Sequence, residues 1–292
     1  MLDILVTGGD GQLGRSLQRL GAVSPNRYHF TDRAQIDITD AEAVRAAVEA
    51  THASVIVNCA AYTAVDRAEE EPEAAELLNA TAPGHLAAAA AHAGATLIHV
   101  STDYVFDGRG NTPLAEEAPT APLGVYGRTK LRGEQAVAAS GCRAITIRTA
   151  WLYSEYGCNF LKTMLRLTAE REELRVVCDQ TGTPTYAGDL ALAIFSIIES
   201  GRYRGCEGLY HFSDEGVCSW YDFAAEIAAE AGRDACRIEP CRTADYPTRA
   251  VRPAYTVLDK TKIKRTFDLE IPHWRDSLRY CMERLAAQEQ RQ

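Results

Sequence analysis

Short apolar runs alternate with longer segments of helical periodicity through the first half of the chain. Five such runs predict strands: Ile4–Thr7, Tyr28–Thr31, Val55–Asn58, Leu97–Ser101 and Ala144–Arg148. Several are apolar at every position, which is typical of parallel strands covered by helices on both faces. The segments between them predict helices: Leu13–Leu20, Ala41–Ala50, Glu73–Ala93 (with Pro83 expected to kink or interrupt it) and Tyr126–Ala139. The alternation predicts an α/β fold with a doubly wound, Rossmann-type parallel sheet.

The pattern becomes less regular after residue 150. Further strands are expected at Leu174–Val177 and Leu209–Phe212, and further helices at Gly188–Ser200, Trp220–Ala231 and Arg275–Ala287. The segment Cys236–Pro253 is rich in Arg and Pro and is expected to be mostly loop. We therefore expect a dinucleotide-binding domain at 1–150, completed by part of 174–212. A smaller, loop-rich substrate-binding lobe is expected at 151–292, interleaved with the first domain.

Composition and charge narrow the class of protein. Hydrophobic residues make up 46% and charged residues 24% of the chain, which is ordinary for a packed globular protein. The formal net charge of -9 is spread along the sequence and gives no support to a nucleic-acid surface. No apolar run is long enough to cross a bilayer and no signal peptide is recognisable, so no membrane association is expected. Nine cysteines without a C-x-x-C pair indicate free thiols, and hence a cytoplasmic location.

A glycine-rich loop follows the first predicted strand directly and opens a helix. Its sequence is Gly8-Gly9-Asp10-Gly11-Gln12-Leu13-Gly14. In such a loop the first glycine allows a tight turn and the second lets the backbone approach a pyrophosphate. The third, Gly14, lets the helix lie close to the strand, and the free N–H groups of the helix face the phosphates. The position of the loop at the head of a strand–helix–strand unit predicts a dinucleotide site.

Two neighbouring residues give opposite indications about the cofactor. Asp32, at the end of the second predicted strand, is placed to accept hydrogen bonds from the adenosine ribose, which favours NAD. Arg33 is placed to pair with a 2′-phosphate, which favours NADP. The preference between NADH and NADPH therefore stays open. Asp37 and Ile38, further along the same loop, flank the adenine in one interpretation and begin the next helix in another.

Small residues follow the third predicted strand. The segment Asn58-Cys59-Ala60-Ala61-Tyr62-Thr63 carries them where ligands of open α/β sheets bind, so Ala60, Ala61, Tyr62 and Thr63 are candidates for cofactor contacts. Tight packing of a helix against the sheet is an equally good explanation of the small side chains.

A candidate catalytic group comes from the fourth strand and the helix after it. Thr102 ends that strand, and Tyr126 and Lys130 lie four residues apart, on one face of the helix. We expect Tyr126 to act as proton donor, Lys130 to lower its pKa by charge, and Thr102 to polarise the same substrate oxygen. A Y-x-x-x-K pair alone is weak evidence, but the order of glycine loop, small strand end, hydroxyl and Tyr/Lys pair is specific.

At these residues the chain resembles the dTDP-4-dehydrorhamnose reductase family of the extended short-chain dehydrogenase/reductase superfamily. The segments that carry the resemblance are Ile4–Gly14, Asn58–Pro72, Ser101–Gly108, Tyr126–Glu134, Ile147–Tyr153, Asp179–Ala191 and Tyr246–Asp259. The last three lie outside the cofactor machinery of the superfamily and indicate the reductase branch.

The resemblance implies reduction of the 4-keto group of dTDP-6-deoxy-L-lyxo-4-hexulose to dTDP-L-rhamnose, with NADH or NADPH as cofactor. It implies that Tyr126 donates the proton and that Thr102, Asp103 and Trp151 contact the sugar nucleotide. The cofactor contacts that it implies are Gly11, Gln12, Leu13, Asp37, Ile38, Ala61, Tyr62, Thr63, Tyr126 and Lys130. Arg249 and Arg252 are our own candidates for the diphosphate, with ordinary surface arginines as the equal alternative.

Some members of this family bridge two subunits through Mg²⁺ held by glutamates. At the positions that we align with those glutamates, this chain has Ser16 and Gly188, neither of which is a carboxylate ligand. Asp189 is adjacent, so a shifted alignment would weaken the comparison. We expect no metal site and either a monomer or a metal-free homodimer.

Two other functions compete with this one. A reductase or epimerase of another nucleotide-linked keto-deoxysugar would use the same cofactor fold, although dehydratases of this branch usually place acids directly after the strand-end Thr. Here Thr102 is followed by Asp103 and then Tyr104. The second alternative is a non-catalytic, NADP-binding regulatory subunit, such as the one that some methionine adenosyltransferases carry. The complete set of Tyr126, Lys130 and Thr102 favours an enzyme.

Overall fold

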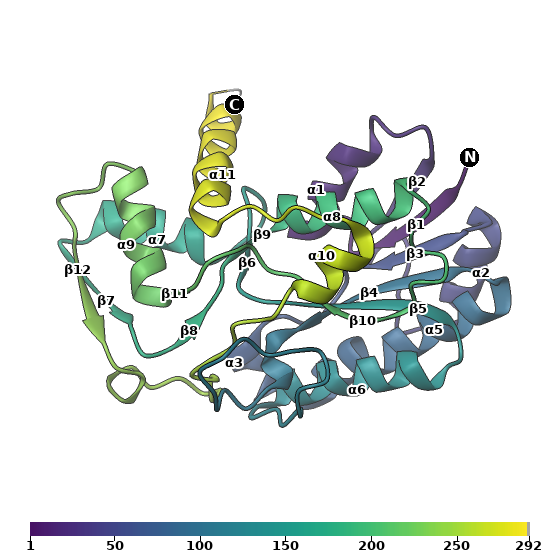
Figure 1. Cartoon of the computed structure of the whole chain (residues 1–292), viewed down its shortest axis with the longest axis horizontal. Helices are drawn as coiled ribbons and strands as arrows, with labels where there is room; N and C mark the ends of the chain where they lie inside the picture. The colour runs from purple at the N-terminus through teal and green to yellow at the C-terminus, as the bar shows by residue number, and fades with distance from the viewer. Residues whose placement is uncertain (291–292) are drawn as a thin grey trace.

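The centre of the molecule is a six-stranded, all-parallel sheet, shown in a computed structural model that describes residues 1–290 (Figure 1). Its strand order is β10–β5–β4–β3–β1–β2. The strands are β1 (Asp3–Thr7), β2 (Arg27–Thr31), β3 (Val55–Asn58), β4 (Thr96–Thr102), β5 (Arg143–Thr149) and β10 (Gly208–His211). The doubly wound parallel sheet predicted from the sequence is confirmed.

Helices cover both faces of this sheet because its strands carry apolar side chains on both sides. Ile4 and Val6 pack with α1 (Gln12–Gly21) and α8 (Ala187–Glu199), whereas Leu5 between them packs with the opposite layer. That opposite layer consists of α2 (Ala41–Thr51), α5 (Ala82–Ala93) and α6 (Val125–Ala139). The alternation places two hydrophobic cores on one sheet, and both are almost completely buried.

The predicted helix Glu73–Ala93 is interrupted before Pro83, as the sequence indicated. It consists of α4 (Pro72–Glu76), a π-helical turn η1 (Leu77–Thr81) and α5. Pro83 has no N–H to donate to Asn79, and the wider turn absorbs the lost bond. The backbone of Gly133 in α6 lies against the freed Asn79 carbonyl, where even a Cβ atom would come within 2.1 Å of the oxygen.

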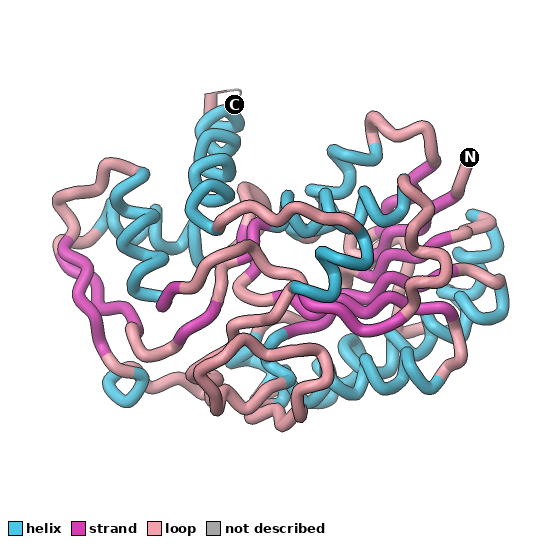
Figure 2. The backbone as a smooth tube through the Cα atoms, in the orientation of Figure 1, coloured by secondary structure: helices cyan, strands magenta, loops and turns pink. Residues whose placement is uncertain are grey.

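The second lobe is built on the sequence after β5 and is richer in loops (Figure 2). Its helices are α7 (Phe160–Glu170), α9 (Trp220–Glu230) and α11 (Trp274–Glu289), which share a core that includes Leu161, Phe223 and Trp274. Three two-stranded pairs complete it: β6 (Leu152–Tyr153) with β9 (Thr185–Tyr186), β8 (Thr181–Gly182) with β11 (Cys218–Ser219), and β7 (Glu173–Val177) with β12 (Arg237–Cys241). The short helices α3 (Val65–Ala68) and α10 (Thr261–Phe267) complete the list of α-helices.

The segment Cys236–Pro253 is mostly loop, as expected, although a short strand, β12, lies within it. β12 pairs in parallel with β7, and Pro240 is tolerated in this two-stranded pair. The strand predicted at Leu174–Val177 exists, but its partner is β12 and not the main sheet. The helices α7 and α10 were not predicted. Within residues 1–290, no helix has both the length and the apolar character needed to cross a membrane.

Candidate active site

A cavity of about 1020 Å³ lies at the carboxyl ends of the parallel strands. Residues that follow β1, β2, β3, β4 and β5 line it, and Phe160 and Trp220 of the second lobe also contribute. Most of the predicted site residues line this cavity: Gly8, Gly11, Gln12, Leu13, Asp32, Arg33, Asp37, Ile38, Ala60, Ala61, Tyr62, Thr63, Thr102, Asp103, Tyr126, Lys130 and Trp151. Gly14, Arg249 and Arg252 do not line it.

The glycine loop fits a dinucleotide. Gly8 has a φ of +69°, and a Cβ atom there would lie 2.7 Å from the Ala60 nitrogen, so the turn requires glycine. At Gly14 a Cβ atom would lie 2.2 Å from the Gly8 carbonyl, which explains how α1 begins so close to β1. Gly11 precedes α1 as its N-cap residue, and the free N–H groups of the first helical turn lie beside the cavity. This arrangement can hold a pyrophosphate.

The loop after β2 holds both residues that bear on the cofactor preference. Asp32 Oδ1 accepts hydrogen bonds from the N–H groups of Ala34 (2.8 Å) and Gln35 (3.0 Å), which fixes the turn. Arg33 is exposed beside it. An acceptor for ribose hydroxyls and a cation for a 2′-phosphate therefore lie side by side at one end of the cavity.

Tyr126 and Lys130 lie one turn apart on α6 and both line the cavity. Burial raises the pKa of Tyr126 to about 12, while a hydrogen bond with Thr102 acts in the opposite direction. The predicted lowering of this pKa by Lys130 is therefore wrong for the protein by itself. Lys130 is 2% exposed, and its Nζ donates to the Val100 carbonyl at 2.7 Å. Its own pKa falls to about 8 through burial, opposed by Glu134.

A buried ion pair that the sequence analysis missed lies behind Lys130. Glu134 accepts two hydrogen bonds from the Arg148 guanidinium, at 2.9 and 2.7 Å, and one from the Ser101 hydroxyl at 2.5 Å. The side chains of Arg148 and Glu134 are only 3% and 9% exposed. Ser101 is next to Thr102, and Glu134 is one turn from Lys130, so the pair joins β4, β5 and α6 beneath the predicted catalytic group.

Asp103 brings a carboxyl group into the cavity wall beside Thr102. It is 1% exposed, and burial raises its pKa to about 6 against hydrogen bonds from Thr256 and Thr102 that lower it. Its Oδ1 accepts from the Thr102 hydroxyl at 3.1 Å. Its Oδ2 is buried without a partner among the residues that the structure describes. A buried acceptor of this kind suits a hydroxyl group of a ligand.

Trp151 lies on the second lobe's side of the cavity. Its indole stacks face to face on that of Trp220, with ring centroids 3.6 Å apart and planes 9° apart. Phe160 contacts Trp220 in turn, with centroids 4.6 Å apart. Trp220 and Phe160 were not predicted as site residues, because only the three-dimensional fold brings α7 and α9 to the end of β5.

Three other missed residues hold predicted ones in place. Asn79, in the π-helical turn, accepts from the Tyr62 N–H (2.9 Å) and donates to the Tyr62 carbonyl (3.0 Å). The carbonyl oxygen of the Gln12 side chain accepts from Ser154 (3.0 Å) and Asn159 (2.9 Å), which ties the glycine loop to the second lobe. Only Asn79 had any signal in the sequence. Pro83 predicted an interruption of the helix, and the interruption is the π-helical turn that contains Asn79.

The two arginines proposed for the diphosphate have carboxylate partners instead. Arg252 binds Asp66, with its Nη2 2.6 Å from Oδ2, and Arg249 pairs with Glu70. These contacts join the loop at 249–252 to α3 and the residues just after it. The same loop leads to Tyr255, which forms an isolated β-bridge with Thr181 of β8.

The positions aligned with magnesium ligands are occupied as follows. The Ser16 hydroxyl donates to the Gln12 carbonyl at 3.0 Å, and Gly188 lies in the first turn of α8. No group of three or more His, Cys, Asp or Glu side chains within residues 1–290 is arranged to hold a metal ion.

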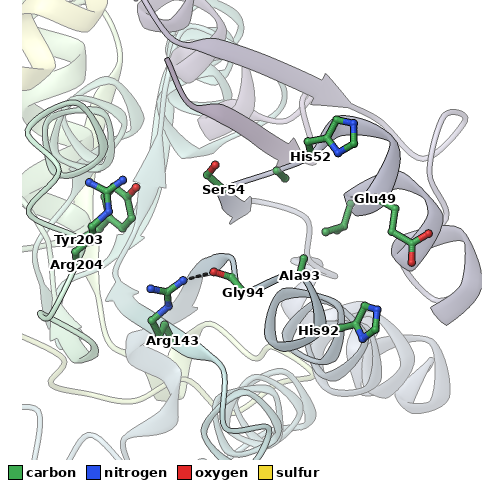
Figure 3. A pocket seen from close by; sticks show the side chains of 11 residues that line it. Glu49, His52, Ser54, His92, Ala93, Gly94, Arg143, Tyr203 and Arg204 are labelled. Carbon is green, nitrogen blue, oxygen red and sulfur yellow. Dashed lines mark hydrogen bonds between the residues drawn. The ribbon is translucent and has the colours of Figure 1, made fainter.

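A second cavity, of about 640 Å³, lies at the amino ends of β3, β4 and β5, the end of the sheet opposite the candidate active site (Figure 3). His52, His92, Arg143 and Arg204 give it a basic lining. Arg143 donates to the carbonyl of Gly94, the C-cap residue of α5, and His52 is the C-cap residue of α2. Helix carboxyl ends attract cations, so helix capping accounts for this charge.

The chain matches the family model described as the RmlD substrate binding domain over residues 2–287. A dTDP-4-dehydrorhamnose reductase from Burkholderia thailandensis is 41% identical over 303 residues, covering 98% of this chain and 100% of the relative. A probable dTDP-4,6-dihydroxy-2-methyloxan-3-one 4-ketoreductase from Streptomyces antibioticus is 42% identical over 286 residues, covering 98% and 96%.

A solved structure agrees with these relatives. The dTDP-4-dehydrorhamnose reductase of Bacillus anthracis, in complex with NADP, superimposes with a TM-score of 0.91 at 36% identity. The superposition covers 97% of this chain and 100% of the other. This chain therefore belongs to the dTDP-4-dehydrorhamnose reductase family.

Proposed function

We propose that this protein is an oxidoreductase that reduces the 4-keto group of dTDP-6-deoxy-L-lyxo-4-hexulose to dTDP-L-rhamnose, with NADH or NADPH as cofactor. The observation that carries the proposal is that Thr102, Tyr126 and Lys130 line the same cavity as the glycine loop. A hydride donor held on the glycine loop and a proton donor on α6 would thus both reach a substrate bound in this cavity. Relatives with the reductase activity in their names support the same reaction.

The chain's own residues bind the cofactor and handle the proton. Gly8, Gly11, Gln12 and Leu13 hold the pyrophosphate, and Gly14 allows their approach to β1. Asp32, Arg33, Asp37 and Ile38 bind the adenosine end, and Ala60, Ala61, Tyr62 and Thr63 line the middle of the site. When bound, the nicotinamide supplies hydride to the carbonyl carbon. Tyr126 donates its proton to the oxygen that becomes negative, and the Thr102 hydroxyl polarises that oxygen.

The second lobe contributes the contacts to the sugar nucleotide. Asp103 accepts hydrogen bonds from sugar hydroxyls, and Trp151 offers a flat apolar surface to the deoxysugar. Arg249 and Arg252 would bind the diphosphate only by exchanging their carboxylate partners for phosphate oxygens. In this scheme residues 1–150 and part of 174–212, including β10, bind the cofactor, and residues 151–292 complete the substrate site.

The surroundings of the reaction follow from the same proposal. The nine cysteines are free thiols, which fits the reducing cytoplasm. The active unit is a monomer or a metal-free homodimer. Sedimentation velocity with and without EDTA tests this, because a metal-bridged dimer would dissociate when the chelator is added.

The test of the reaction is oxidation of NADPH and NADH with the keto-sugar generated in situ, for wild type and Tyr126→Phe. Loss of one proton donor should lower kcat about 10²–10⁴-fold while cofactor affinity stays close to wild type. Tyr104→Phe is the matched control, since its ring lies 5.5 Å from that of Tyr126, and it should cost far less. Turnover of Tyr126→Phe at the wild-type rate would rule out Tyr126 as proton donor.

A second candidate is reduction of a different dTDP-linked keto-deoxysugar. The Streptomyces antibioticus relative is named for such a 4-ketoreductase, and it is as similar to this chain as the rhamnose enzymes are. Chromatographic identification of the sugar product separates the two substrates. Cofactor binding without turnover of any keto-sugar would instead favour a regulatory subunit.

A further inference from the structure

The two stacked indoles of Trp151 and Trp220, here called the tryptophan stack, form one wall of the active-site cavity. Both residues line the cavity and both are partly exposed. The third tryptophan, Trp274, lies 2% exposed in the core of the second lobe. Trp220 therefore differs from an ordinary core tryptophan, because its ring stacks on the Trp151 ring and lines the active-site cavity.

The backbone around the stack is built to bring the two rings together. Trp220 is the first residue of α9, and its helix begins with a capping box between Ser219 and Asp222. The preceding strand, β11, pairs with β8 so that Cys218 lies opposite Gly182. A Cβ atom at Gly182 would come within 2.8–3.0 Å of the Trp151 indole, so this indole also lies directly against the β8 backbone.

Trp151 is held in an unusual conformation. Its φ is +48°, one of three positive values at non-glycine residues among the residues that the structure describes. A bulky side chain rarely adopts this region unless its surroundings impose it. The other two such residues, His52 and Asp268, are C-cap residues of helices, where a left-handed conformation is common. At Trp151 no helix ends. Its carbonyl accepts from the Thr185 N–H at 3.2 Å, and its indole packs against Trp220 and the backbone of Gly182, so both contacts hold the conformation.

We propose that Trp220 is a positioning residue for the sugar nucleotide. Its indole fixes the plane of the Trp151 ring, so that the ring presents a rigid flat surface to the deoxysugar. The inference rests on the proposed function for the identity of the ligand. The sugar is recognised by its apolar face, and a wall that is already ordered binds it without a further loss of side-chain entropy.

The inference predicts a particular division of kinetic effects. Without the neighbouring ring, as in Trp220→Ala, the Trp151 ring loses its support and KM for the sugar nucleotide should rise about tenfold, the equivalent of one stacked aromatic contact. KM for NADPH should stay within about twofold, because the glycine loop and Lys130 are untouched. Trp220→Phe keeps an aromatic face and should recover most of the affinity.

Trp274→Phe is the control for changing an indole in the same lobe but outside the cavity, and it matches Trp220→Phe in the aromatic surface removed. It should leave both KM values near wild type even where the melting temperature falls. If Trp220→Ala binds the sugar nucleotide as wild type does, or if both KM values rise together, Trp220 is not a positioning residue for this ligand.

A binding measurement without turnover keeps this test separate from the proposed reaction. In Trp274→Phe the stack contains all the remaining tryptophans, so its fluorescence reports on the stack alone. Titration with dTDP-L-rhamnose should change that fluorescence, and when Trp220→Ala is added the midpoint of the change should move to about tenfold higher ligand concentration. An unchanged response in the double variant overturns the inference. Failure of wild-type turnover, with the fluorescence response present, overturns the proposed reaction and leaves the inference standing.

Discussion

The buried pair of Arg148 and Glu134 gives the sharpest stability prediction. Glu134→Gln keeps the size of the side chain and an oxygen for the Ser101 hydroxyl, but it removes the charge. Arg148 then stays buried with two long contacts, to the Glu116 carbonyl at 3.4 Å and to His211 Nε2 at 3.5 Å. Burial and the Arg148 charge lower the pKa of His211 to about 3, so the imidazole is neutral. It carries no negative charge that could offset the Arg148 guanidinium.

The size of the effect follows from this burial. Breaking a buried ion pair at one partner typically costs about 3–5 kcal/mol, because the other charge is left without compensation. The exposed pair of Arg45 and Glu49, whose side chains are 48% and 49% exposed, provides the contrast. Such a pair contributes about 0.3–0.5 kcal/mol on a helix. At about 2 °C per kcal/mol for a chain of this size, Glu134→Gln should lower the melting temperature by about 6–10 °C and Glu49→Gln by about 1 °C.

The assay is thermal unfolding followed by circular dichroism, with urea unfolding as a second measure. The double variant Glu134→Gln/Arg148→Met removes both charges and should recover a large part of the loss, since no charge is left buried alone. Equal melting temperatures for Glu134→Gln and Glu49→Gln would refute the reasoning, because they would mean that solvent reaches Arg148. A double variant that is no more stable than Glu134→Gln would refute it as well.

Three further predictions concern the cavity and the glycine loop beside it. Burial raises the pKa of Asp103 from 3.8 to about 6, so wild type should lose about 3 kcal/mol of stability relative to Asp103→Asn as pH rises from about 3 to 7. Urea unfolding measures the difference between the two proteins, and a difference that does not change with pH contradicts the prediction. Arg33→Ala should raise KM for NADPH about tenfold and leave KM for NADH unchanged, as measured by steady-state kinetics. An equal rise in both KM values would count against a contact between Arg33 and the 2′-phosphate. Gly14→Ala should lower the free energy of unfolding by about 1–3 kcal/mol through overpacking, as measured by urea unfolding. Gly110→Ala is the control and should lower it little, because its Cβ would meet nothing nearer than 3.9 Å. Equal losses in the two variants would contradict the close packing at Gly14.

Local signals in the sequence were sufficient for the main sheet. Each of the five N-terminal strands is a short run with several apolar residues and a helix after it in the sequence, which is the pattern of parallel strands. The strand at Leu209–Phe212 could be predicted for the same reason, as β10. The parallel pairing of β7 with β12 could not, because it joins segments about sixty residues apart and Pro240 weakens the strand signal in one of them.

The candidate site divides in the same way. The glycine loop and the Tyr126/Lys130 spacing are local patterns, and the structure brings both to one cavity. Other residues of the site make their contacts with partners outside their own local segment, so no spacing of residues in the sequence predicts them. These are Trp220, Asn79 and the pair of Glu134 and Arg148. The direction of the Tyr126 pKa shift also depends on burial, which only the assembled fold determines.

That shift changes how the proposed proton transfer is understood. A phenol with a pKa of about 12 keeps its proton at neutral pH and releases it only to a stronger base. The alkoxide formed by hydride addition is such a base, since the pKa of its conjugate acid, an alcohol, lies well above that of a phenol. Lys130, with a pKa of about 8, is in turn a stronger acid than Tyr126, although its Nζ donates to the Val100 carbonyl and not to the phenol. The pKa values of Tyr126 and the product are therefore ordered so that the proton transfer to the sugar is downhill, which suits reduction.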